Sequence, residues 1–207
     1  MAAGLHSHDA YGFESARSVA AKLLSYALPF VAAGVLTLMA SPRKTAAQPS
    51  MVILVRHGEK EVSPESDVSL SKEGFARAEA LNEALVHLTP DAIVVTTYKR
   101  TQQTAAVVAK RAGITPIVVP VTQGHVRAVA DTVMRQSGVV LVVGHNNTVP
   151  AIIGALGGPR LATLCETNFA TLFILLPARD GKSAQLVKAS YGAPDAPDAT
   201  ECQTDTP

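Results

Sequence analysis

The sequence has no lysine- or arginine-rich run. Its 18 Lys and Arg residues are balanced by 17 Asp and Glu residues, which gives a formal net charge of +1. Proteins that bind nucleic acid concentrate cationic side chains in a patch or a stripe. The charge pattern therefore excludes an extended surface for nucleic acid, and a site for a smaller anion must be local.

Cysteine is scarce, and no group of residues has the spacing of metal ligands. Cys165 and Cys202 are the two cysteines. They could pair in an oxidising compartment, or one could be a packed thiol and the other a thiol in a tail. His6 and His8 are close in sequence, but they lie in a terminal segment outside the predicted domain. We expect no metal centre and no cofactor.

Only one long apolar run occurs, over residues 23–40, and it carries no charge. Its length lies between the core of a signal peptide and a minimal membrane-spanning helix. We favour a cleaved export signal or an uncleaved N-terminal anchor over a buried helix, because Pro29 and Gly34 disfavour a helix in the core. If Arg17 and Lys22 stay inside, both favoured interpretations place the rest of the chain outside the cytoplasm, periplasmic or membrane-anchored.

The chain is long enough for one substantial core and short for two ordinary domains. We predict a signal peptide or anchor over residues 1–47, one domain over residues 48–191, and a disordered tail over residues 192–207. The tail is rich in Ala, Pro, Asp and Thr, a composition that disfavours a packed core. Contact with a membrane is expected only through the N-terminal segment.

Strand-like and helix-like segments alternate after residue 50. Ser71 is the expected N-cap of the first helix, which ends at Thr89. The other expected helices cover residues 99–112, 126–135 and 148–156, and the expected strands cover residues 51–55, 92–95, 117–121, 139–143, 171–176 and 185–189. This order predicts an α/β fold, a three-layer α/β/α sandwich with a mainly parallel central sheet.

Unusual polar residues follow three of the predicted strands. Arg56, His57 and Gly58 follow the first strand, Arg100 lies just beyond the second, and His145 follows the fourth. Ligands of parallel sheets bind at the carboxyl ends of the strands. If these ends converge, two arginines and two histidines surround one point, and this arrangement requires an anion. Because guanidinium groups match the oxygens of phosphate, we predict a phosphoryl ligand.

The two histidines suggest a reaction as well as binding. A neutral imidazole is nucleophilic near physiological pH, so His57 could attack phosphorus and form a phosphohistidine that water hydrolyses. Gly58 would let the backbone and the phosphate approach closely. His145, if protonated, would donate a hydrogen bond to the oxygens in the transition state. The arginines and His145 supply the positive charge, so this chemistry needs no metal.

Four segments in order resemble the signatures of the histidine phosphatase superfamily, which has the phosphoglycerate mutase-like fold. They are LVRHGEK, LSKEGFARAEAL, TTYKRTQQTA and VVGHNNTVP, and the resemblance extends over residues 51–178. It implies that His57 is the phosphorylated nucleophile, that Arg56 and Arg100 hold the phosphate, and that His145 completes the pocket. It also implies that Asn146 and Asn147 provide an amide contact or a helix cap rather than catalysis.

The chain departs from the family pattern in one respect. Many members carry a proton-donating glutamate in the segment that corresponds to residues 118–130, which here contains no carboxylate. Glu59 is a candidate substitute, as is Glu166. His125 lies in the same segment, where we expect a surface histidine at a helix start. The short bacterial phosphohistidine phosphatases, which this chain resembles in its compactness, also lack this acid.

The sequence therefore predicts a phosphoric monoester hydrolase of the histidine acid phosphatase type. Its substrate would be a phosphorylated small molecule or a phosphoprotein, as a phosphomonoester or a phosphohistidine. Two alternatives stay open: a phosphate-binding protein with little turnover, and a phosphomutase. The sequence does not identify the physiological substrate or the oligomeric state.

Overall fold

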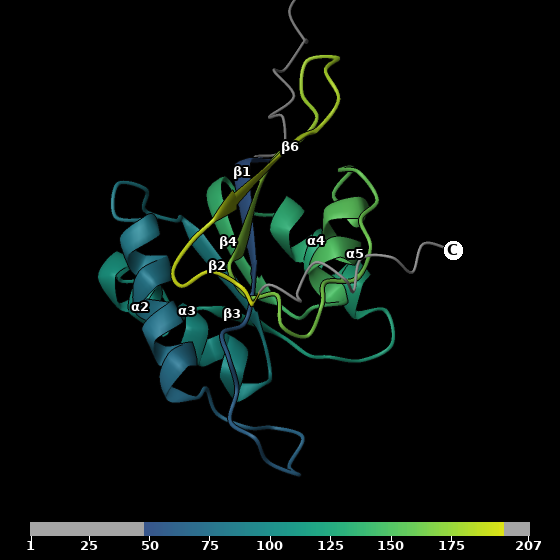
Figure 1. Cartoon of the computed structure of the whole chain (residues 1–207). Coiled ribbons are helices and arrows are strands. Elements are labelled where there is room, and N and C mark those ends of the chain that lie inside the picture. Colours follow the sequence, from purple (N-terminus) through teal and green to yellow (C-terminus); the bar gives the residue numbers. More distant parts are fainter. Residues whose placement is uncertain (1–47, 197–207) are drawn as a thin grey trace, which may run out of the picture. The chain divides into compact units, whose positions relative to one another are not determined.

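A six-stranded sheet organises residues 48–196, the part of the chain that the computed structural model describes (Figure 1). Its strand order is β3-β2-β4-β1-β5-β6. Strands β3, β2, β4 and β1 are mutually parallel, β5 is antiparallel to β1, and β6 is antiparallel to β5. The elements in chain order are β1 (Pro49–Arg56), α2 (Lys72–Ala84), β2 (Ala92–Thr96), α3 (Lys99–Ala112), β3 (Ile117–Val119), α4 (His125–Met134), β4 (Gly138–Gly144), α5 (Thr148–Ala155), β5 (Thr171–Leu176) and β6 (Gln185–Ser190). The predicted α/β fold with a mainly parallel sheet is confirmed.

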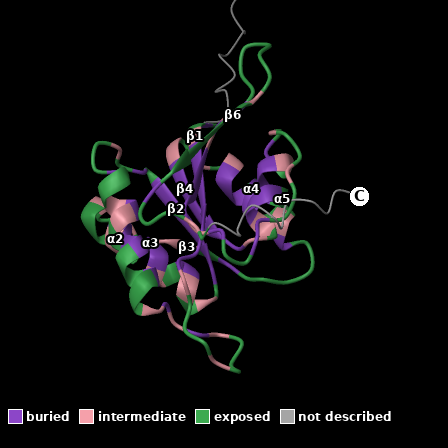
Figure 2. Ribbon diagram, in the orientation of Figure 1, coloured by how far each residue is buried: buried purple, intermediate pink, exposed green. Residues whose placement is uncertain are grey.

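Strand β1 is buried on both faces, and its alternating side chains belong to two separate cores. Val52 and Leu54 belong to one core, which includes buried residues of α4 and α5. Ile53 and Val55 belong to the other, which includes buried residues of α2 and α3. Because side chains alternate across a strand, a continuous apolar run can fill both layers. Figure 2 shows this buried sheet between the two helical layers.

Helix α2 begins where the sequence predicts and ends about one turn earlier. The Ser71 side chain accepts a hydrogen bond from Gly74 N, as expected of an N-cap. After Ala84 the chain tightens, because Val86 N bonds to Glu83 O and Leu88 N bonds to Leu85 O. These three-residue spacings are those of a 3₁₀ turn. The apolar spacing of the sequence continues through this turn, which explains the overlong prediction.

Helix α3 has the predicted bounds and ends at Gly113. This glycine has φ 68°, in the left-handed region, and its N–H bonds to Ala109 O and Lys110 O. A glycine takes this conformation without steric cost and so ends the helix cleanly.

The predicted disordered tail begins too early. Asp195 Oδ1 accepts hydrogen bonds from the backbone N–H groups of Phe169 at 2.6 Å and Ala170 at 2.8 Å. Arg77 Nη1 donates to Ala193 O at 3.1 Å. Residues 192–196 are therefore part of the folded domain, held by hydrogen bonds to distant segments that their composition does not reveal.

The remaining predictions about the termini fall outside the described residues. These are the signal peptide or anchor over residues 1–47, the tail over residues 197–207, and the second cysteine, Cys202. Cys165 is buried. Among the helices of residues 48–196, none combines the length and the apolar character needed to cross a membrane.

Candidate active site

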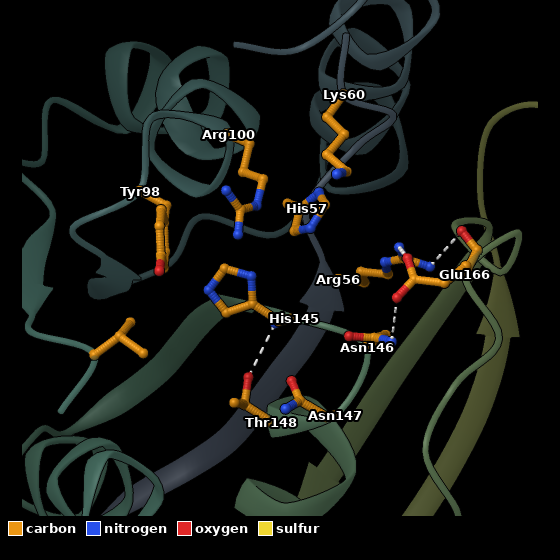
Figure 3. A pocket seen from close by; sticks show the side chains of 11 residues that line it. Arg56, His57, Lys60, Tyr98, Arg100, His145, Asn146, Asn147, Thr148 and Glu166 are labelled. Atoms are coloured by element: carbon orange, nitrogen blue, oxygen red, sulfur yellow. Dashed lines mark hydrogen bonds and ion pairs between the residues drawn. The ribbon is translucent and has the colours of Figure 1, made fainter. Parts of the chain in front are cut away.

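The register of the sheet brings His57 and His145 together. Strands β1 and β4 are parallel neighbours, with Arg56 opposite Gly144, and His57 N donates to Gly144 O at 2.9 Å. The next residues of both strands therefore leave the sheet at the same edge. The ring centroids of His57 and His145 are 5.3 Å apart (Figure 3). Since β2 pairs with the other side of β4, the start of α3 lies at the same edge.

A cavity of ≈ 280 Å³ opens at this edge. Five residues of the predicted site line it: Arg56, His57, Arg100, His145 and Asn146. The other lining residues are Lys60, Tyr98, Val121, Asn147, Thr148 and Glu166, of which Glu166 is a predicted candidate proton donor. Arginine and lysine side chains outnumber the one carboxylate among these residues, so the cavity has the charge that an anionic ligand requires.

Hydrogen bonding and burial keep the imidazole of His57 neutral. Its Nδ1 lies 2.7 Å from Gly58 O, and a carbonyl oxygen only accepts, so Nδ1 carries the proton and Nε2 keeps its lone pair. Burial lowers the pKa of His57 to about 3, helped by the charges of Arg56, His145 and Arg100 and opposed by the bond to Gly58 O. The imidazole is therefore uncharged at neutral pH, which is the state that a nucleophile needs.

His145 is also neutral while the cavity is empty. Burial, helped by the charges of Arg100, His125 and Arg56, lowers the pKa of its imidazole to about 4. The predicted hydrogen bond from a protonated His145 therefore depends on the ligand. A phosphoryl dianion beside the ring would favour the imidazolium, because an adjacent opposite charge raises a histidine pKa.

Arg56 is held by the segment after α5. It is 2% exposed, and its Nη1 donates to Cys165 O at 2.6 Å and to Glu166 O at 2.8 Å. Its Nη2 forms an ion pair with Glu166 Oε2 at 2.7 Å, and its guanidinium stacks over Phe169 at 4.1 Å. Nε is buried without a partner. Nη2 therefore faces an exposed carboxylate, and a phosphate would reach this nitrogen by displacing Glu166.

Arg100 points into the space beside both histidines (Figure 3). Its guanidinium stacks on the Tyr98 ring at 4.1 Å, and Nη1 donates to Ser66 O at 3.2 Å. Nε is buried without a partner. Lys99 N, at the start of α3, donates to Asp67 Oδ1 at 2.8 Å. The loop that contains Ser66 and Asp67 thus fixes both the helix start and the arginine.

Gly58 serves a different purpose from the one predicted. A Cβ built on this residue would lie 2.8 Å from Gly74 O, and Gly58 does not line the cavity. A Cβ on Gly74 would lie 2.0 Å from Glu59 O, so the two glycines allow the loop after β1 to touch the start of α2. The close approach that requires glycine is therefore between two backbones, and the structure gives no contact of Gly58 with a ligand site.

The prediction of Glu59 as a proton donor disagrees with the structure. Its Oε1 lies 2.9 Å from Nε and 2.6 Å from Nη2 of Arg77, and it does not line the cavity. Glu166 is the carboxylate that the described residues place at the cavity. It accepts hydrogen bonds from Asn146 Nδ2 at 2.8 Å and from Arg56. Asn146, predicted to contact the ligand, lines the cavity while bonded to this carboxylate.

Two residues near the site differ from the expected surface positions. His125 begins α4 as predicted but is 5% exposed, with Nδ1 2.9 Å from Pro120 O. Thr101, whose place in the first turn of α3 favours a cap or a surface position, is fully buried and bonds to Thr96. A polar residue in the first turn of a helix gives no sequence signal of this burial, because cap positions favour the same residue types.

Comparisons with known proteins agree with the fold. Residues 52–123 match the model of the histidine phosphatase superfamily (branch 1). A comparison with curated proteins gives no significant match. The solved structure of a protein described as the phosphohistidine phosphatase SixA from Agrobacterium tumefaciens is 24% identical and has a TM-score of 0.51. The match covers 70% of this chain and 99% of that protein's chain.

A second solved structure, the mycobacterial glucosyl-3-phosphoglycerate phosphatase Rv2419c, is 18% identical with a TM-score of 0.51. This match also covers 70% of this chain and 99% of that protein's chain. At these identities both structures show that the fold is shared. The family match covers β1, α2, β2, α3 and β3, which contribute Arg56, His57 and Arg100 to the cavity. Residues 52–123 therefore match the histidine phosphatase superfamily, and the described domain shares the fold of both solved structures.

Proposed function

We propose that this protein is a phosphatase that hydrolyses a phosphomonoester or a phosphohistidine through a covalent phosphohistidine on His57. The main support is the hydrogen bond from His57 Nδ1 to Gly58 O, which leaves Nε2 as a neutral nucleophile. His145 and Arg100 lie beside this ring, where they can stabilise the charge of a transferring phosphoryl group.

In the first step, Nε2 of His57 attacks phosphorus and the bond from phosphorus to the leaving atom breaks. The leaving group departs with the bonding electrons and takes a proton from solvent water. In the second step, water attacks the phosphohistidine, and inorganic phosphate and neutral His57 are released. The positive charges of Arg100, Arg56 and Lys60, which line the cavity, offset the phosphate charge in both steps.

The lining of the cavity favours a weakly basic leaving group. Glu166 accepts hydrogen bonds from Arg56 and Asn146, so both of its oxygens are in use as acceptors. A carboxylate in this role is a poor source of a proton. An imidazole or a phenol leaves more readily than an alkoxide when no acid assists it. This favours phosphohistidine or an aryl phosphate over an alkyl phosphate such as a sugar phosphate.

The test is rapid-quench trapping of the phosphoenzyme with labelled p-nitrophenyl phosphate and a labelled phosphohistidine peptide. A phosphatase of this type gives a labelled histidine at position 57 and multiple turnovers, and His57→Ala gives neither. A phosphate-binding protein retains phosphate without a labelled histidine. A phosphomutase returns the label to an added acceptor rather than to water. Either of the last two results would reject the proposed function.

We also propose that the phosphatase works outside the cytoplasm, periplasmic or membrane-anchored. The support is the uncharged apolar segment at residues 23–40 and its flanking cations. Cell fractionation combined with sequencing of the mature N-terminus tests this. A full-length chain in the cytosolic fraction would reject it.

A further inference from the structure

A chain of buried hydrogen bonds leads from the start of α3 to His145. Thr101 in the first turn of α3 is 0% exposed, and Thr96 at the end of β2 is 2% exposed. Their Oγ1 atoms are 2.9 Å apart, and Thr96 Oγ1 is 3.2 Å from Nε2 of His145. Neither threonine lines the cavity, and the lining side chain to which Thr96 is hydrogen-bonded is that of His145.

The direction of these hydrogen bonds follows from the number of protons. The hydroxyl of Thr101 has one proton, and two carbonyl oxygens lie within its reach: Tyr98 O at 2.9 Å and Thr96 O at 3.3 Å. Carbonyl oxygens only accept, so Thr101 donates to one of them. In the hydrogen bond between the two hydroxyl groups, the oxygen of Thr101 is therefore the acceptor and the hydroxyl of Thr96 is the donor.

Thr96 has no second proton to give to His145. Its Oγ1 already receives a hydrogen bond from Tyr98 N at 3.3 Å, and one lone pair remains for Nε2 of His145. The imidazole must therefore donate through Nε2–H. In a neutral histidine only one ring nitrogen carries a proton, so Nδ1 keeps its lone pair.

We propose that Thr101 and Thr96 are positioning residues that hold neutral His145 in its Nε2–H tautomer, so that Nδ1 is the nitrogen that exchanges a proton with a bound phosphoryl group. Figure 3 shows one ring nitrogen of His145 facing His57 and Arg100 and the other facing away from them. The identity of the ligand rests on the proposed function. The tautomer is a property of the protein without a ligand.

Replacing Thr101 with valine should reverse the direction of the hydrogen bond between Thr96 and His145. Thr101→Val keeps the shape of the side chain and removes the oxygen that accepts from Thr96. The proton of Thr96 can then turn to Nε2 of His145, which lies 3.2 Å away. This arrangement selects the Nδ1–H tautomer. Thr101→Ser restores the hydroxyl and is the matched control.

Long-range ¹H–¹⁵N correlation spectra of the histidine rings test the proposal at neutral pH, where the low pKa of about 4 keeps His145 uncharged. His145→Gln assigns its signals. Nε2–H is expected in the wild type and in Thr101→Ser, and Nδ1–H or a mixture in Thr101→Val. We expect kcat for p-nitrophenyl phosphate to fall on the order of 10- to 100-fold in Thr101→Val, with a smaller change in KM, and to recover in Thr101→Ser.

An Nδ1–H tautomer in the wild type would overturn the proposal, as would an unchanged tautomer in folded Thr101→Val. If Thr101→Val does not fold, Thr96→Val and Thr96→Ser replace the pair. Thr96→Val removes the acceptor of Nε2–H and should give a mixture of tautomers, and a pure Nε2–H form there would overturn the proposal. An inactive wild type with the expected tautomers would reject the proposed function and leave the tautomer assignment standing.

Discussion

The carboxylate of Glu166 is bound by the arginine that the sequence predicts to hold phosphate: its Oε2 lies 2.7 Å from Nη2 of Arg56. The Glu166 side chain is 74% exposed, whereas that of Arg56 is 2% exposed. An exposed carboxylate therefore occupies one nitrogen of a buried guanidinium at the cavity. A phosphate that enters must compete with it.

Glu166→Gln should strengthen phosphate binding. The amide can keep the hydrogen bond to Asn146 but has no charge to compete for Arg56. We expect KM for p-nitrophenyl phosphate and the inhibition constant of inorganic phosphate to fall about 3- to 10-fold, the size of a modest charge interaction. Steady-state kinetics measure both, with the exposed Glu65→Gln as the control. A collapse of kcat would instead make Glu166 a catalytic acid.

Glu59→Gln should affect stability rather than chemistry. Glu59 forms an ion pair with Arg77, which is 4% exposed and also donates to the backbone at Tyr191 and Ala193. Removing one partner of a largely buried pair leaves the other uncompensated, at a cost of about 2–4 kcal/mol in the free energy of unfolding. Urea denaturation measures the loss. If the variant has normal stability and a greatly reduced kcat, the result would instead support Glu59 as the proton donor.

Gly58→Ala should destabilise the domain because the added methyl would meet Gly74 O at 2.8 Å. Gly74 O is a backbone atom and the added methyl is fixed to the backbone, so neither can rotate away. We expect the free energy of unfolding to fall by about 1–3 kcal/mol. Gly154→Ala is the matched control, since Gly154 lies inside α5 and has nothing within 4 Å of an added Cβ. That change should stabilise the protein by about 0.5–1 kcal/mol. Equal effects of the two changes on thermal unfolding would contradict the packing role of Gly58.

The two active-site histidines should make the domain sensitive to acid. Their pKa values are lowered to about 3 for His57 and about 4 for His145, from an ordinary value of 6.5. Between pH 6.5 and pH 4 the unfolded chain binds more protons than the folded one, so stability falls as the pH falls. Each histidine contributes at most about 1.4 kcal/mol per pH unit.

Urea denaturation across this pH range measures the slope. The double variant His57→Gln and His145→Gln should flatten it, while His87→Gln, at an exposed position, should leave it unchanged. A slope that survives the double change would show that the acid sensitivity arises elsewhere.

Local sequence patterns predict the scaffold well. Apolar runs fix the buried strands, and Ser71 and Gly113 mark helix ends through their own backbone and side-chain chemistry. Convergence of His57 and His145 also follows from the sequence once the sheet is taken as parallel, because polar residues after two such strands share one edge.

Long-range partners explain what the sequence could not predict. Glu59 turns away from the cavity because Arg77 on α2 binds it. Residues 192–196 are joined to the domain because Asp195 binds the backbone at Phe169 and Ala170. Thr101 is buried because the end of β2 supplies a hydroxyl partner. In each case the deciding contact joins groups whose adjacency depends on the completed fold.

Rapid-quench trapping of a phosphorylated histidine tests the covalent route through His57 most directly. Wild-type protein mixed with labelled p-nitrophenyl phosphate should give an acid-labile, base-stable label on the peptide that contains His57, formed and lost at rates consistent with kcat. His145→Gln should bind phosphate and accumulate less label. Turnover without any label on His57, or turnover that persists in His57→Ala, would contradict the covalent route.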